Sequence, residues 1–173
     1  KWDFTRETDR RRCRERLLAE TPFMVIGSPP CTMFSNLMIF NKTRMDQKNY
    51  QQKWFEARVL LGFAAEVDQL QVDGGRHFLH EHPAGATSWA DEWIDRLLRH
   101  PKVSSVISHH CEYGLLTPDD QGLPTPAKKP TRWMSSSPHM LKRLSRRCSG
   151  SHVHQHLVGG RDKAAEDYSL QLI

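Results

Sequence analysis

The chain has 173 residues, of which 38% are hydrophobic and 26% charged, and 25 Lys and Arg against 20 Asp and Glu give it a net charge of +5. This length predicts one globular domain with a real core, and no apolar run is long enough to span a bilayer or to act as a signal peptide. The basic excess suits a nucleic-acid partner without requiring one.

The first half of the chain predicts a helix, a strand and a long helix. A helix over residues 9–20 ends before Pro22, and the apolar run 23–27 favours a short buried strand that Pro29 and Pro30 stop. A long helix over 47–72 follows, because apolar residues recur there at helical spacing. Gly74 and Gly75 would end it.

The second half alternates in the same way. We expect strands at 76–83, 103–108 and 132–135, a helix capped by Ser88 that ends before Pro101, a loop over 115–129 and a helix over 138–147. This alternation predicts an α/β fold with a mostly parallel sheet and helices on both faces.

The four cysteines lie far apart without paired spacing, at Cys13, Cys31, Cys111 and Cys148. Such usage favours a reducing, intracellular compartment over a disulfide framework. Cys111 is interpreted as a packed thiol. The two prolines hold Cys31 at the point where the first strand ends. In that place its thiol is either a nucleophile or a small buried side chain.

Three motifs fall at the ends of successive predicted strands. They are Ser28-Pro29-Pro30-Cys31 followed by Phe34-Ser35, Glu81 in His-Glu-His-Pro, and Tyr113-Gly114 followed by Lys129-Pro130-Thr131-Arg132. In order and spacing, over residues 2–136, they resemble the motifs of the DNA (cytosine-5) methyltransferases. The resemblance implies a Rossmann-like S-adenosylmethionine-dependent core over 1–147, incomplete at its N-terminus, with a His-rich C-terminal extension over 148–173.

The resemblance also implies roles for single residues. Cys31 would add to C6 of a flipped cytosine, Glu81 would assist at N3 if burial raises the pKa of its carboxyl group, and Arg132 would steady the nucleotide or the cysteine loop. S-adenosylmethionine would contact three residues, Asp3, Pro29 and Pro30. DNA would contact three residues, Ser35, Lys129 and Arg132, and the protein would be nuclear if it acts on DNA in a eukaryote.

The chain departs from the family pattern at several points. The glycine-rich cofactor motif would precede Lys1, Pro130 replaces the first Arg of Arg-x-Arg, and His82 replaces the Asn after the glutamate. Two main interpretations stay open, and plain nucleic-acid binding through the basic runs is a third. The chain is part of a methyltransferase completed by an upstream segment or another protein subunit, or it is an inactive fold that serves as a structural or binding subunit of a larger assembly.

A metal site is the alternative to a simple solvated tail at the C-terminus. Cys148, His152, His154 and His156 form the pattern C-x3-H-x-H-x-H, whose ligand types suit zinc. Alternate histidines reach one tetrahedral centre only if the backbone bends, so a resident metal is not the primary expectation.

Overall fold

A computed structural model describes residues 1–157, apart from the side chains at positions 37, 39 and 40. Its centre is a four-stranded sheet in the order β1-β2-β6-β3. The strands are β1 (Met24–Gly27), β2 (His77–Pro83), β3 (Ser104–His109) and β6 (Pro130–Ser135). The fold is therefore mixed α/β, as the alternation of predicted elements indicates.

The sheet is mixed in direction rather than mostly parallel. β1 and β2 pair in parallel, whereas β6 lies between β2 and β3 and runs antiparallel to both. β6 runs antiparallel to β3 because the connection from His109 to Pro130 contains no α-helix and begins and finishes at the same end of the sheet. Parallel strands need a crossover, usually through a helix, to reach the opposite edge.

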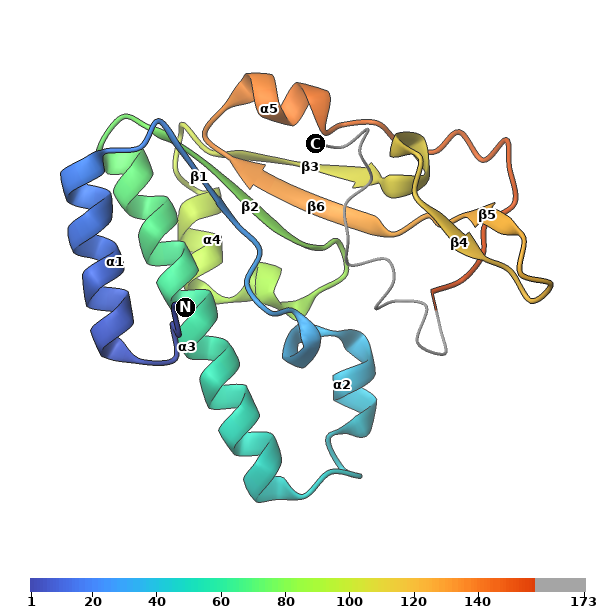
Figure 1. Cartoon of the computed structure of the whole chain (residues 1–173), viewed down its shortest axis with the longest axis horizontal. Coiled ribbons are helices and arrows are strands. Elements are labelled where there is room, and N and C mark those ends of the chain that lie inside the picture. The colour runs from blue at the N-terminus through green and yellow to red at the C-terminus, as the bar shows by residue number, and fades with distance from the viewer. Residues whose placement is uncertain (158–173) are drawn as a thin grey trace.

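Helices cover both faces of this sheet (Figure 1). The long helix α3 (Gln47–Asp73) packs on β1, β2 and α4 (Glu92–Leu98), and encloses a core that includes Leu61, Phe78 and Met134. On the opposite face, α5 (Pro138–Arg143) covers Leu79 and Trp133. The prediction of helices on both faces is thus confirmed.

The close approach of α3 and α4 depends on one glycine. A Cβ atom built on Gly62 would lie 2.9 Å from Cζ3 of Trp93, inside van der Waals contact. The indole can therefore lie against the backbone of α3 only because position 62 has no side chain.

Several element boundaries differ from the sequence prediction. Helix α1 (Glu7–Glu20) begins two residues early, a short α2 (Asn36–Asn41) follows the cysteine loop, and α5 ends at Arg143 rather than at 147. The predicted loop 115–129 contains a two-stranded hairpin of β4 (Leu116–Pro118) and β5 (Pro124–Pro126). Ser88 lies in a 3-10 turn, and the side chain of Asp91 caps α4 in its place.

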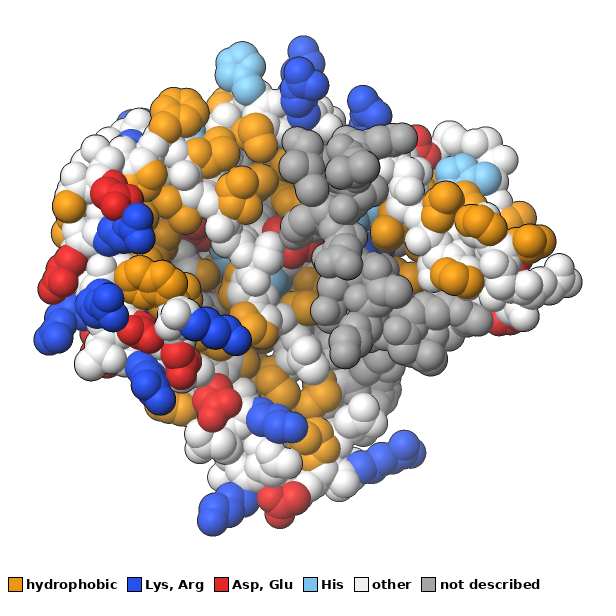
Figure 2. Space-filling view, viewed as in Figure 1, with side chains coloured by type: hydrophobic (Ala, Val, Ile, Leu, Met, Phe, Trp, Pro, Cys, Tyr) orange, Lys and Arg blue, Asp and Glu red, His pale blue; other side chains and the backbone are white. Residues whose placement is uncertain are grey.

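The surface that Figure 2 shows carries no continuous field of one charge. Lys and Arg side chains alternate with Asp and Glu over the helices, whereas apolar side chains gather on the β4–β5 hairpin, where Leu116 and Leu123 are exposed. Among residues 1–157, no helix combines the length and the hydropathy needed to cross a bilayer.

Candidate functional site

The carboxyl ends of β1, β2 and β3 meet at one edge of the sheet. β2 and β3 both run antiparallel to β6, so they point the same way, and β1 is parallel to β2. The loop 28–31, Glu81 and the turn η3 (His110–Tyr113) lie at or next to this edge. In α/β sheets, ligands and chemistry concentrate at this edge.

His82 fastens the cysteine loop to the end of β2. Its Nε2 donates to the carbonyl oxygen of Pro29 at 2.7 Å, so Nε2 carries the proton, and Nδ1 lies 2.6 Å from the Ser88 hydroxyl. The His82 side chain is fully buried. Burial, with a smaller contribution from the charge of His80, lowers the pKa of His82 to about 4, so the ring is neutral at neutral pH.

A buried polar pair lies next to His82. Nδ1 of His80 and Oδ2 of Asp68 are 2.8 Å apart, and both side chains are 2% exposed or less. Burial raises the pKa of Asp68, and the hydrogen bond with His80 opposes that shift. The indole of Trp89 meets the rings of His80 and His82 edge-on, which closes the group from the α4 side.

The predicted catalytic residues fall on two faces of the sheet. Glu81 pairs in register with Trp133, whereas Arg132 pairs with His82, and paired residues share a face. Arg132 donates to the Ser105 hydroxyl through Nε and Nη2, and its guanidinium lies 4.7 Å from the centre of the Trp89 ring. Glu81 is almost buried at 8% exposure, and Cys31 is half-buried. The sheet thus separates Glu81 from Arg132. The loop 28–31 lies at the end of the sheet, where its two faces meet.

A cavity of about 420 Å³ opens beside the cysteine loop. Two of the predicted cofactor residues, Pro29 and Pro30, line it together with Ser28, Asp68 and apolar side chains of α1, β1 and α3. The third, Asp3, lies outside this lining. Its carboxylate accepts from the backbone and hydroxyl of Thr5, a local turn that also lowers the pKa of Asp3.

The predicted DNA-contacting residues belong to three local environments. Ser35 is the N-cap position of α2, where it makes no side-chain cap hydrogen bond. Lys129 directly precedes β6 with a positive φ of 30°, and it lines a surface hollow together with Lys128, Pro130 and residues 152–157. Arg132 is directed toward Trp89 on the α4 side.

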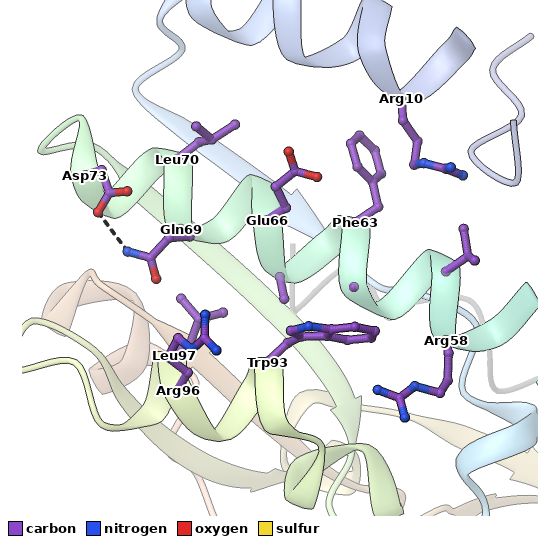
Figure 3. A pocket seen from close by; sticks show the side chains of 13 residues that line it. Arg10, Arg58, Phe63, Glu66, Gln69, Leu70, Asp73, Trp93, Arg96 and Leu97 are labelled. Carbon is purple, nitrogen blue, oxygen red and sulfur yellow. Dashed lines mark hydrogen bonds between the residues drawn. The ribbon is translucent and has the colours of Figure 1, made fainter. Parts of the chain in front are cut away.

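A wider groove of about 730 Å³ lies away from the sheet edge, between α1, α3 and α4 (Figure 3). Arg10, Arg58 and Arg96 line it together with Glu66 and Asp73. Arg58 pairs with Asp91 and Glu92 on its rim. Because the charges of the groove are mixed and partly paired, it lacks the uniform sign expected of an anion site.

A second group of chemistry-bearing side chains lies beyond the end of β3. Ligand atoms of Cys111, Cys148, His152 and His154 all lie within 4.8 Å of one another. Three of these residues belong to the predicted metal-binding pattern, but Cys111 takes the place given to His156. Burial, with the neighbouring Cys148, raises the pKa of Cys111 to about 11, so this thiol is neutral at neutral pH unless a cation lies beside it.

The sequence alone assigned no functional role to two residues that the structure brings into these sites, His82 and Cys111. His82 stood out only as a departure from the family pattern, and its contact with Pro29 spans 53 positions. Cys111 lies 37 positions before Cys148, too far for a recognisable ligand spacing. Comparison of the chain with family models, with curated proteins and with solved structures finds no match.

Proposed function

We propose that this chain is the nucleophile-bearing part of a DNA cytosine-5 methyltransferase-like protein with a Rossmann-like core. The observation that carries the proposal is the 2.7 Å hydrogen bond between Nε2 of His82 and the carbonyl oxygen of Pro29. This contact joins the loop of Cys31 to the strand end of Glu81, two segments that must act together on one base. The motif resemblance supplies the reaction, and the shared edge supports it.

The chemistry assigns Cys31 and Glu81 different tasks. The Cys31 thiolate forms a bond to C6 of cytosine, and the electron pair of the C5–C6 double bond moves into the ring. Glu81 meets N3 with a hydrogen bond or a proton and thereby stabilises the negative charge that develops on the ring. After methylation at C5, loss of the C5 proton restores the double bond and expels the Cys31 thiolate. A base inside a duplex must be flipped out to reach this edge.

The cavity beside the prolines supports a cofactor site. Its volume of about 420 Å³ lies in the usual range for small-molecule pockets, about 300–1,000 Å³. Its walls combine apolar side chains with Ser28, Pro29 and Asp68, a lining suited to an aromatic base and a sulfonium-bearing chain. S-adenosylmethionine, when bound, supplies the methyl group. A further cofactor-binding segment, in this protein or in another, would complete the site.

The edge strand β1 favours a second candidate function, that of a binding subunit. Phe23 is 75% exposed and Ile26 on β1 is 65% exposed, beside a strand edge that no described strand covers. Apolar edge strands are surfaces for pairing with another chain. In this function the sheet would be extended by a partner without any chemistry at Cys31.

Covalent trapping distinguishes the two functions. Duplex DNA that contains 5-fluorocytosine would be incubated with the protein, with and without its cofactor-binding segment, in the presence of S-adenosylmethionine. Fluorine at C5 cannot leave as a proton does, so we expect a stable adduct that is lost in Cys31→Ser and kept in Cys13→Ser. A folded, cofactor-complete protein that forms no adduct contradicts the methyltransferase proposal and favours the binding subunit.

A further inference from the structure

The segment after α5 has no regular secondary structure up to residue 157, yet it is held in place. The backbone N–H of Cys148 donates to Nδ1 of His109 at 3.0 Å, and that of Gln155 donates to the carbonyl oxygen of Pro126 at 2.9 Å. Leu157 packs against Leu115 and Ala127. Two thiol and two imidazole side chains converge where this segment crosses the end of β3.

Two sulfur–nitrogen distances within the cluster are close to those of a tetrahedral metal site. Zn–S bonds of about 2.3 Å and Zn–N bonds of about 2.0–2.1 Å at tetrahedral angles place sulfur and nitrogen about 3.5–3.6 Å apart. Sγ of Cys148 lies 3.6 Å from Nε2 of His152 and 3.3 Å from Nε2 of His154. The ring centres of the two histidines are only 4.5 Å apart and the ring planes are inclined at 66°, so both can direct Nε2 at one point.

The backbone around Cys148 suits a metal-bound thiolate. The N–H of Gly150 donates to Sγ of Cys148 at 3.3 Å, which leaves the sulfur as the acceptor. This turn requires a φ of +80° at Gly150, a value that a residue with a side chain adopts only with strain. The Cys-Ser-Gly turn thus directs a backbone donor at the sulfur in the manner of outer-shell contacts of metal ligands.

We propose that Cys111, Cys148, His152 and His154 bind one Zn²⁺ ion in a closed structural site. Two sulfur and two nitrogen donors in tetrahedral reach select Zn²⁺ over Ca²⁺ or Mg²⁺, which prefer oxygen ligands. Because four protein ligands leave no open position, the role of the ion is structural and not catalytic. It fastens the segment 148–157 to the turn after β3 and shapes the basic hollow beside Lys128 and Lys129. This site is independent of any chemistry at Cys31.

Metal analysis of the purified protein tests the ligand set. We expect about one zinc per chain, and cobalt substitution should give the visible absorption of a tetrahedral cobalt–thiolate centre. Cys111→Ser and Cys148→Ser should each lose the bound metal and the cobalt absorption. His156→Ala is the matched control, since it removes a neighbouring histidine outside the cluster, and it should keep both signals.

A ligand exchange guards against variants that fail to fold. His154→Cys replaces one zinc ligand by another and should keep about one zinc per chain, whereas His154→Ala should lose it. A metal-free wild-type protein overturns the proposal, and so does a protein in which Cys111 and Cys148 form a disulfide under reducing purification. Loss of zinc in His156→Ala with retention in His154→Ala contradicts the ligand set.

Discussion

At the scale of single residues, the account depends on what His82 does. A histidine at this position could have marked a decayed site, but the ring makes two hydrogen bonds while fully buried, one to the cysteine loop and one to Ser88. An amide side chain has two N–H donors, one of which could reach the same carbonyl. We therefore interpret His82 as a replacement for the asparagine of the resembled family that still positions the loop.

Two substitutions test His82 as a positioning residue. His82→Ala leaves the Pro29 carbonyl and the Ser88 hydroxyl without their partner, and we expect a loss of roughly 2–4 kcal/mol in the free energy of unfolding. His82→Asn keeps an N–H donor, so its free energy of unfolding should fall by less than that of His82→Ala. Alkylation of Cys31 in the folded protein separates positioning from stability, because only the alanine variant should change its rate. Equal Cys31 rates in both variants and the wild type would contradict the positioning role.

At the scale of elements, sequence periodicity predicted the helices and strands whose formation depends on residues close together in the chain. Helix α3 and its end at Gly74 follow from local spacing, and its N-cap Asp46 accepts from the backbone of Asn49. The direction of β6 and the meeting of Cys111 with Cys148 depend on how distant segments return, which no local pattern encodes. Ser88 has the composition of a cap, but its hydroxyl is used by His82, and Asp91 caps α4 instead.

The cap of α4 gives a test at the same scale. The carboxylate of Asp91 accepts from the backbone of Trp93 and lies 3.5 Å from the guanidinium of Arg58 while only 10% exposed. Asp91→Ala should therefore cost about 1–2 kcal/mol in urea unfolding, and Asp91→Asn, which keeps the cap, should cost less. If instead Ser88→Ala frayed α4 and Asp91→Ala did not, as judged by amide hydrogen exchange, the assignment of the cap would be wrong.

At the scale of the whole molecule, buried histidines should govern stability in acid. Burial is the main cause that lowers the pKa of both His82 and His110 to about 4, against a value of about 6.5 in the unfolded chain. Between these values the unfolded state binds more protons, so stability is fully present above pH 6.5 and falls as the pH drops toward 4. Each residue contributes a slope of up to about 1.4 kcal/mol per pH unit.

Urea unfolding at a series of pH values measures this slope. His82→Asn should reduce the loss of stability between pH 6.5 and 4, because one of the two titrating groups is removed. His139→Ala removes an exposed histidine and should leave the slope unchanged. A wild-type stability that stays constant over this range would show that the two buried rings do not titrate as proposed.

Competitive alkylation of the four cysteines tests the central proposal, that Cys31 is the nucleophile at the carboxyl ends of the strands. The folded protein would be treated with a limiting amount of iodoacetamide across a pH series, and the labelled peptides quantified by mass spectrometry. Burial raises the pKa of Cys13, so this thiol should react slowly, and the proposed zinc site would protect Cys111 and Cys148. We predict that Cys31 is labelled first. A Cys31 that reacts no faster than Cys13 at neutral pH would contradict the account.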